Sequence, residues 1–390
     1  MEKEKRKASI IILSYNTMEI TKLCLDSIRR FTEPGTYEII VIDNASSDGS
    51  VNYLQTQSDI KLILNKENMG FPKGCNQGII AAEENNDILL LNSDTIVTPR
   101  WLSQLRRALY SDEKIGAVSC VTNCCSNRQQ ISVKYTSTAE LAQFADTFNR
   151  TDEKKWIPFF RLVGFCMLIK RSVVDKIGYL DEAFSPGNYE DDDYSFRIRE
   201  AGYKLLLCKD TFIHHFGSAS FKKHFTKEEL AEKQKRYQTL MEKNLNYFCT
   251  KWKVADQYEA VDNIVIKKLP DMVADGTKIL NITNYYINDI FYLGAKYRNA
   301  KIRGILFDKR AAEIANWDNC YKVDSCGDTE TEIIVAIEEK YDIVVISQLQ
   351  TMTNNAERFL ERILEFVNED GTVYFSIKDE NYVAEKIGER

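Results

Sequence analysis

Short apolar runs alternate with helical patterns over about the first 120 residues, and this alternation limits the fold more than any other feature of the chain. The runs at residues 9–13, 37–43, 60–64, 87–91 and 116–121 are predicted strands. Strands that alternate with helices form βαβ units, so we expect an α/β domain with a mostly parallel, Rossmann-like sheet. In such a sheet the ligand binds beyond the carboxyl ends of the strands.

Polar residues follow three of these predicted strands directly. Residues 14–16 (SYN) follow the first strand, 43–48 (DNASSD) end the second and continue from it, and 92–94 (NSD) follow the fourth. This placement at one edge of the sheet is what a nucleotide site requires.

Two aspartates in these clusters are candidates for ligand contacts. Asp43 is a candidate acceptor for the imide N–H of a pyrimidine base, with an Asx turn or a helix cap as the alternative interpretation. Asp94 is a candidate ligand for a hard cation that bridges two phosphates. Its alternative role is to cap the helix that Pro99 is expected to open.

A glycine-rich segment, 68–78 (NMGFPKGCNQG), follows the third strand. Its three glycines allow the backbone to approach a ligand closely. Lys73 and Asn76 are candidate contacts to phosphate or base, and an ordinary turn is the alternative.

Further downstream, acidic and histidine residues are candidates for catalysis and metal binding. The acidic run 190–193 could supply a general base, because a carboxylate crowded by others holds a proton more tightly. The alternative is the acidic first turn of a helix at 194–200. His214 and His215 could complete a metal site that suits manganese better than calcium, or could simply be packed or exposed.

Length and composition indicate a soluble chain of several domains. The chain has 390 residues, which suggests two or three domains, and a net charge of -6, which favours neither nucleic acid nor acidic membrane. The start, MEKEKRK, is not followed by a signal-peptide pattern, and no apolar run reaches the roughly 20 residues of a transmembrane helix. We expect reduced cysteines, including the cluster at residues 120–125, and a cytoplasmic location.

The domain organisation follows from the same patterns. We expect a first domain at 1–255 that includes a loop-rich insertion with a helix at 138–148 and a long helical stretch at 222–252. Residues 256–275 are a predicted linker, and 276–390 a smaller α/β domain.

Seven segments, taken in order, resemble family 2 glycosyltransferases of the GT-A fold over Ser9 to Ser220. They are ILSYN, VIDNASSDGS, NMGFPKGCNQG, LLLNSDTIVTP, VGFCMLIKRSVVDKIGYLDEAF, YEDDDYSFRIREAG and HHFGSAS. Any one is a weak signal, but the order of all seven is not expected by chance.

The resemblance implies roles for individual residues. It places the nucleotide sugar against Ser14, Tyr15, Asn16, Asp43, Asp48, Gly70, Lys73, Asn76, Asn92, Ser93 and Gly164. Asp191 matches the catalytic base, with Glu190 and Asp193 in support. Asp94 and His215 match the metal ligands. Asn92 stands where the family's D-x-D motif has its first acid, so Asp94 is expected to carry most of the metal binding.

The implied activity is an inverting, Mn²⁺- or Mg²⁺-dependent transfer of a sugar from a nucleotide-diphosphate donor to a hydroxyl of a glycan or protein. The resemblance favours UDP-sugars, UDP-GlcNAc among them, and flagellin is one option for a protein acceptor. A non-catalytic nucleotide-sugar-binding protein is the first alternative, and a bifunctional glycosyltransferase/methyltransferase is the second.

The C-terminal segments ILNITNYY, IRGILFDKRAAEIA, KYDIVVISQLQ and FLERILEFVNEDGTVYFSI resemble part of a class I methyltransferase. The glycine-rich cofactor loop of that family is missing, since NITNYYIND has no glycine. We therefore expect no S-adenosylmethionine binding and a non-catalytic role for this domain.

Overall fold

The computed structural model describes residues 6–217, 227–256, 258, 263–284, 286–326, 330–377 and 381–386. It divides into two compact units, Met1–Leu245 and Asn246–Arg390. The division falls inside the long helix α8 (Lys227–Trp252), before the end of the predicted first domain at residue 255. Residues 222–226 of the predicted helical stretch and 218–220 of the HHFGSAS segment lie outside the described residues.

The first unit is built on an eight-stranded sheet with the order β3-β2-β1-β4-β8-β6-β9-β7. β1 to β4 and the pair β6–β9 run parallel, while β8 and β7 are antiparallel to their neighbours. The predicted mostly parallel sheet is therefore confirmed. Its strands are β1 (Ala8–Ser14), β2 (Tyr37–Asp43), β3 (Ile60–Leu64), β4 (Asp87–Leu91), β6 (Ile115–Val121), β7 (Trp156–Pro158), β8 (Cys166–Ile169) and β9 (Lys204–Phe212).

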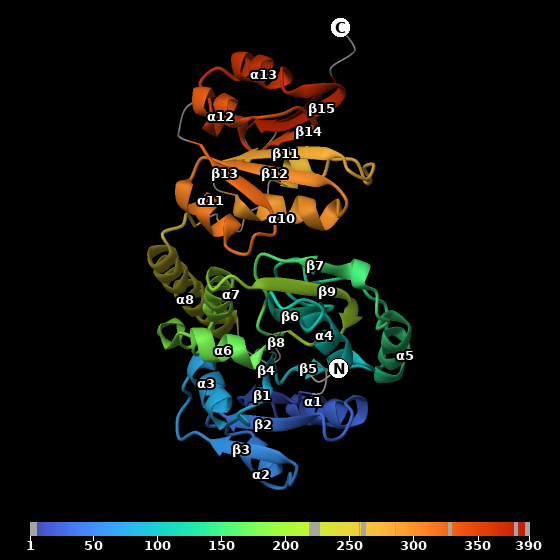
Figure 1. Ribbon diagram of the computed structural model, residues 1–390. Helices are drawn as coiled ribbons and strands as arrows, with labels where there is room; N and C mark the ends of the chain where they lie inside the picture. The colour runs from blue at the N-terminus through green and yellow to red at the C-terminus, as the bar shows by residue number, and fades with distance from the viewer. Residues whose placement is uncertain are drawn as a thin grey trace. The chain divides into compact units, whose positions relative to one another are not determined.

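Helices cover both faces of this sheet (Figure 1). Side chains alternate along β1, so that Ile10 and Ile12 pack with α1 and α4, whereas Ile11 packs with α3, α6 and α7. The helices of this unit are α1 (Met18–Phe31), α2 (Ser50–Gln55), α3 (Phe71–Ala81), α4 (Trp101–Leu109), α5 (Thr138–Phe148), α6 (Arg171–Ile177) and α7 (Glu190–Glu200). Short 3₁₀ helices cover Glu153–Lys155 and Glu182–Phe184.

The apolar run 159–170 forms a strand only at Cys166–Ile169. The backbone N–H groups of Leu162, Val163 and Gly164 donate to side-chain oxygens rather than to a neighbouring strand. Regular pairing therefore begins only at Cys166, and the preceding backbone is free to turn towards the edge of the sheet.

Two glycines of the glycine-rich run are needed for close packing of the helix on the sheet. A Cβ on Gly74 would lie 2.3 Å from a methyl of Leu13, and one on Gly78 would lie 2.4 Å from Ile11. These glycines let α3 lie directly on β1. Only Gly70, with a φ of 80°, occupies a loop conformation that favours glycine.

The second unit is a smaller α/β domain, as expected, with the strand order β13-β12-β11-β14-β15-β16. Its strands are β11 (Lys278–Thr283), β12 (Lys301–Leu306), β13 (Lys322–Ser325), β14 (Tyr341–Ile346), β15 (Val367–Ile377) and β16 (Asn381–Lys386). Its helices are α9 (Asn263–Ile266), α10 (Ile287–Lys296), α11 (Lys309–Asn316), α12 (Glu330–Ala336), the 3₁₀ helix Leu349–Thr351 and α13 (Ala356–Leu364). Many doubly wound domains share this order, so it does not by itself support a methyltransferase.

The close packing of α3 on β1 makes a testable prediction about stability. Ala is favoured over Gly inside a helix by about 1 kcal/mol, yet Gly78→Ala should destabilise the protein by about 1–3 kcal/mol because its methyl group overlaps Ile11 and Ile42. Urea unfolding measures the change. Ile80→Ala, at a position that is 65% exposed on the same helix, should change stability by less than about 0.5 kcal/mol. A more stable Gly78→Ala protein would contradict the packing.

Candidate active site at the carboxyl edge of the sheet

Asp43 ends β2 at the edge of the sheet, beside Ser14 at the end of β1. Its side chain is fully buried, and its Oδ1 accepts a hydrogen bond of 2.9 Å from the backbone N–H of Ser46. Its Oδ2 has no hydrogen-bond partner in the part of the chain that the structure describes. Because a buried, unpaired carboxylate oxygen is costly, this atom suits a donor supplied by a ligand.

The loops after β1 and β2 are tied together. Asn16, with a φ of 53°, accepts a 2.8 Å hydrogen bond from the N–H of Ser47. Asp48 accepts from the N–H of Met18 and from the hydroxyl of Ser50. Burial alone would raise the pKa of Asp48, but these hydrogen bonds lower it. Asn16 and Asp48 thus shape the pocket wall, and Tyr15, which is 40% exposed, is accessible to a ligand.

The glycine-rich segment lies beside these loops. Asn68 binds the amide of Asn44 and the N–H of Gly70, which holds Gly70 near the end of β2. Lys73 is half-buried in the first turn of α3. The side-chain amide of Asn76 is already hydrogen-bonded within the protein. It donates to the carbonyl of Leu180 and accepts from the N–H of Leu180.

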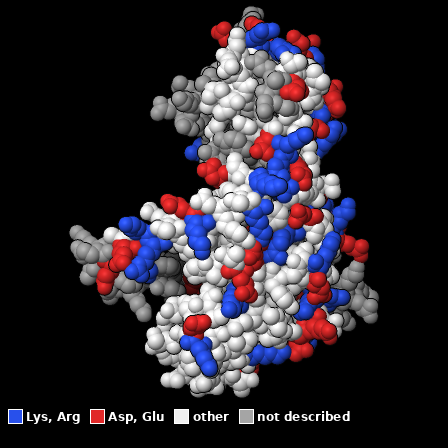
Figure 2. Space-filling view, turned by 90° about the vertical axis from the view of Figure 1, so that its left-hand side faces the viewer, with Lys and Arg blue, Asp and Glu red and all other residues white. Residues whose placement is uncertain are grey.

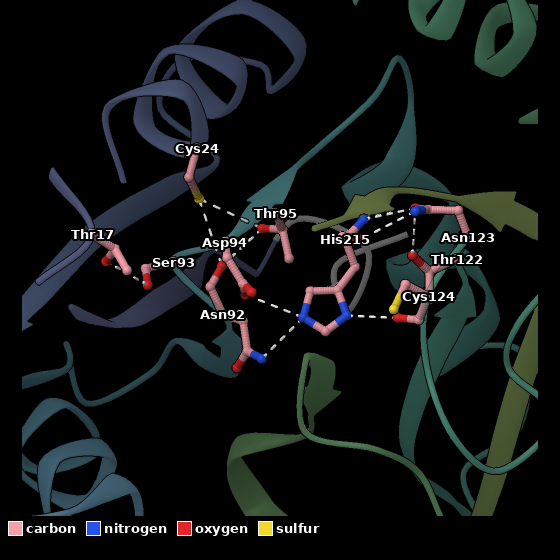
Figure 3. A network of polar contacts seen from close by, with 10 residues as sticks. All are labelled: Thr17, Cys24, Asn92, Ser93, Asp94, Thr95, Thr122, Asn123, Cys124 and His215. Atoms are coloured by element: carbon pink, nitrogen blue, oxygen red, sulfur yellow. Dashed lines mark hydrogen bonds and ion pairs between the residues drawn. The ribbon is translucent and has the colours of Figure 1, made fainter. Parts of the chain in front are cut away.

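Asp94 and His215 face each other across a two-stranded ribbon formed by β5 (Thr95–Ile96) and β10 (His214–His215) (Figure 3). Asp94 Oδ1 lies 3.1 Å from His215 Nε2, and Asn92 Nδ2 lies 3.4 Å from the same nitrogen. The ribbon therefore brings together residues that are 121 positions apart in the chain.

The orientation of the His215 ring is fixed from behind. Its Nδ1 lies 2.7 Å from the carbonyl oxygen of Cys124. Since a carbonyl can only accept, Nδ1 carries a proton, and in the neutral ring the lone pair of Nε2 points at Asp94. Two acceptors at this distance require a cation between them, either a proton or a metal ion.

Neighbouring groups hold this histidine in place. The side chain of Asn123 binds both the N–H and the C=O of His215, at 2.9 and 3.1 Å. The ring of Phe165 stacks on the imidazole, with centroids 5.2 Å apart. Such partners behind a ligand are typical of metal-binding histidines.

The charge of Asp94 controls the protonation of this histidine. Burial lowers the pKa of His215, but the hydrogen bond and charge of Asp94, together with the Cys124 carbonyl, raise it above its ordinary value of 6.5. Without a metal ion the imidazole therefore holds the proton that it donates to Asp94 up to a higher pH than an ordinary histidine does.

A chain of hydroxyl groups connects Asp94 to the end of β1. Ser93 lies 3.5 Å from Thr17, Thr17 lies 3.1 Å from Thr21, and Thr21 lies 3.2 Å from Ser14. Ser14 is next to Asp43 in the sheet, so the predicted base-binding and metal-binding residues line one continuous edge.

Asp191 reaches this edge from the first turn of α7. Its Oδ2 accepts a 2.9 Å hydrogen bond from the N–H of Gly164, and its Oδ1 accepts from the N–H of Asp192. The residue after Gly164 is Phe165, whose carbonyl accepts from Asn92 and whose ring stacks on His215. Two consecutive residues therefore connect Asp191 to the Asp94–His215 pair.

The groups around Asp191 shift its pKa in opposite directions. Burial raises the pKa of Asp191, while the positive charge of Arg161 and the two N–H donors lower it, and the net shift is upward. Arg161 itself forms a 2.5 Å ion pair with Asp192. The Asp191 carboxyl is half-buried, so it can still reach a ligand.

The other acidic residues of the run face inward. Asp193 is fully buried and pairs with Arg197 at 3.0 Å. Glu190 is 7% exposed, and its Oε2 has no hydrogen-bond partner among the described residues. Burial, together with the charge of Asp191, raises the pKa of Glu190 well above its usual range. Their supporting role in catalysis stays a prediction.

Sequence patterns did not indicate the groups that orient His215 and Asp191. The Cys124 carbonyl, Asn123, Phe165 and Arg161 belong to loops or irregular backbone, where no periodicity marks a contact. All ten cysteines, each within the described ranges, are free thiols as expected, although Cys120 is buried in β6 and only Cys124 and Cys125 of the cluster lie in a loop.

Few side chains of the candidate site could bind a metal ion. Within the described residues no group of three or more His, Cys, Asp or Glu side chains could hold a metal. Asp94 and His215 would provide two ligands to an ion bound there, and a half-turn of the Asn92 amide would present a third oxygen. In the same described ranges, no helix is both long and apolar enough to cross a bilayer.

Comparison with known proteins identifies part of the first unit. Residues 9–178 match Glycosyl transferase family 2. The low-salt glycan biosynthesis hexosyltransferase Agl10 of Haloferax volcanii is 29% identical over 208 residues, 52% of this chain and 64% of that protein. The uncharacterized glycosyltransferase YfnE of Bacillus subtilis is 35% identical over 54% of this chain and 64% of YfnE. The chain thus spans less than two thirds of the length of each.

Among solved structures, the chain is similar to the mannosyltransferase PcManGT from Pyrobaculum calidifontis in complex with GDP-Man and Mn²⁺. The TM-score is 0.41 at 20% identity, over 54% of this chain and 57% of the other. Residues 9–178 are thus similar in sequence to family 2 glycosyltransferases, and the description of the fold of the first unit rests on the strand order given above.

The His215–Asp94 pair predicts a specific pH dependence of stability in the metal-free protein. Because the folded-state pKa of His215 lies above its unfolded value, the pair should stabilise the fold fully below about pH 6.5 and lose this effect as pH rises through the folded pKa. His215→Gln should therefore cost roughly 1–2 kcal/mol at pH 5.5 and less at pH 8.5.

Urea unfolding across this pH range, with a chelator present, measures the difference. His214→Gln is the matched control, because Nδ1 of His214 contacts the uncharged hydroxyl of Tyr135. A cost of His215→Gln that grows with pH would contradict the assigned proton.

Proposed function

We propose that this chain is an inverting glycosyltransferase that moves a sugar from a nucleotide-diphosphate donor to an acceptor hydroxyl. The family match over residues 9–178 supports the reaction class. The observation that carries the proposal is the Asp94–His215 pair, joined to Asp191 through Gly164 and Phe165. A metal ligand pair and a candidate base are thereby held at one edge of the sheet.

The donor nucleotide is proposed to bind at the ends of β1 and β2. The buried Oδ2 of Asp43 is suited to a ring N–H of the base, which uracil offers at N3 and guanine at N1. We take a UDP-sugar as the proposed donor, with a GDP-sugar as the alternative. Ser14, Tyr15 and Asn16 would line this end of the pocket. Lys73, in the first turn of α3, would approach the diphosphate.

The residues at the ribbon fit a divalent ion such as Mn²⁺ or Mg²⁺. Neighbouring ligands of an octahedral ion with bonds of about 2.1 Å lie about 3 Å apart, and Asp94 Oδ1 and His215 Nε2 are 3.1 Å apart. Carboxylate with imidazole suits Mn²⁺ well. When bound, such an ion offsets the negative charge of the departing diphosphate.

Asp191 is the proposed general base. Its two backbone donors fix the direction of the carboxylate, and burial raises its affinity for a proton, which suits removal of a proton from an acceptor hydroxyl. A Cβ on Gly164 would lie 3.4 Å from that of Asp191, so the glycine keeps space open above the base. This space is where the donor sugar would lie.

The acceptor is proposed from the type of reaction, and no groove in the structure is assigned to it. A glycan or protein hydroxyl is proposed, with flagellin among the protein options, and the location is proposed to be cytoplasmic. The second unit is proposed to have no methyltransferase activity, and titration with S-adenosylmethionine should show no binding.

The test of the function is turnover of a panel of UDP- and GDP-sugars with Mn²⁺, followed by release of the nucleoside diphosphate. UDP-sugars should be hydrolysed slowly without acceptor, chelation should stop release, and Asp94→Asn should do the same. Binding of UDP with no turnover of any donor would favour the non-catalytic alternative, which the Asn92 replacement motivates.

Asp191→Asn makes the sharpest prediction for the base. Loss of a general base lowers the rate by about 10²–10⁴-fold, while donor binding measured by calorimetry should remain within a factor of about three, because the amide keeps the size of the side chain. Glu200→Gln, at the exposed end of the same helix, is the control and should retain full activity. An active Asp191→Asn enzyme would remove Asp191 from the mechanism.

A further inference from the structure

Two adjoining pockets lie on residues that play no part in the candidate active site. The first is between α4 and the segment that follows α5, and the second lies along α5 and that same segment. The first has a volume of about 410 Å³ and is lined by Arg100, Ser103, Gln104, Arg107, Asn149, Arg150 and Thr151. The second, of about 540 Å³, shares Arg150 and Thr151 and extends to Phe144, Phe148 and Lys155. Each is large enough for a small ligand.

The floor of the first pocket is rigid and its polar groups are paired. Arg100, with a φ of 63°, binds the carboxylate of Asp146 at 2.8 Å and the carbonyl of Asn149 at 2.9 Å. The buried amide of Asn149 binds the hydroxyl of Thr98 and the carbonyl of Pro99. These contacts join the start of α4 to the end of α5.

Gln104 completes this floor. Its Nε2 donates to the carbonyl of Asp210, and its Oε1 accepts from the hydroxyl of Thr151 at 2.8 Å. The side chain is 4% exposed. The pocket is therefore shaped by internal hydrogen bonds and does not depend on a ligand to form.

The rim differs from the floor in its charges. Arg107 and Arg150 are exposed, and neither has an ion-pair partner among the described residues. The nearby carboxylates are already engaged, Asp146 by Arg100 and Asp152 by the N–H of Lys154. Basic and acidic side chains intermix on the face that Figure 2 shows, whereas the two pockets are lined by four basic residues and one acidic residue.

One wall of the second pocket is aromatic. Phe144 and Phe148 are half-buried, with ring centroids 5.2 Å apart, and both contact Phe212 at the end of β9. The pocket pair thus combines guanidinium groups, hydroxyls and an apolar surface. Guanidinium groups pair best with the planar or tetrahedral oxygens of carboxylate and phosphate.

We propose that this pocket pair is a second binding site, for a saccharide that carries a phosphate or carboxylate group. Arg107 and Arg150 would bind the anionic group, and the aromatic wall would cover the apolar face of the ring. The site stands whether or not the chain transfers a sugar, because none of its residues belongs to the candidate active site.

The test is a ligand-observed NMR titration of the full chain at low salt with a chelator present. Glucose 1-phosphate and glucuronate are the anionic probes, and glucose is the uncharged control. At least one anionic probe should bind saturably and glucose should not. Binding should weaken at least tenfold in Arg107→Gln/Arg150→Gln, and also at high salt. The two anionic probes show whether phosphate or carboxylate is preferred.

Two control variants test whether the probes bind at the donor site instead, and whether any loss of positive charge weakens binding. Asp94→Asn should leave probe binding unchanged, and so should Arg30→Gln/Lys114→Gln, which removes the same charge at exposed positions elsewhere. Thermal unfolding should match the unaltered protein in the rim variant, because both arginines are exposed. No saturable binding, equal binding of glucose, or unchanged binding in the rim variant would each overturn the proposal.

Discussion

The contact between Asp94 and His215 is the interaction on which the candidate site depends. It exists because the ribbon of β5 and β10 aligns two distant segments, and because the Cys124 carbonyl fixes the proton on the far side of the ring. The remaining nitrogen and the carboxylate then face each other as two acceptors. A proton or a metal ion must therefore lie between them. A proton would make the pair a contact that stabilises the fold, whereas a metal ion would make it part of the active site.

The strands that build this edge could be predicted because they are short, apolar runs that polar residues or turn signals follow. β2, β3 and β4 begin and end at the predicted residues. The ribbon of β5 and β10 was missed, since two residues on each side carry no periodicity. The segment before Cys166 is apolar but does not form a strand, because side-chain oxygens accept the hydrogen bonds of its N–H groups.

The candidate site residues show a similar division. Asp43 and Asp94 could be predicted from residue type and position after strands, whereas the choice of Asp191 and His215 rested on the family resemblance. What the sequence could not show is which polar groups are occupied. Asn76 is bonded to Leu180, Asp193 is paired with Arg197, and one oxygen of Asp43 has no partner among the described residues. The bond of Asn76 joins residues 104 positions apart, and the Asp193–Arg197 pair joins residues four positions apart on α7, so sequence separation alone does not show which groups are paired.

Crystals grown with a UDP-sugar and Mn²⁺, with data collected at a wavelength where manganese scatters anomalously, give the most direct test. The anomalous peak should lie within bonding distance of Asp94 Oδ1 and His215 Nε2. The uracil imide should contact Asp43 Oδ2, and the sugar should lie over Gly164 beside Asp191. A manganese peak away from the ribbon, or a nucleotide bound away from the ends of β1 and β2, would contradict the site.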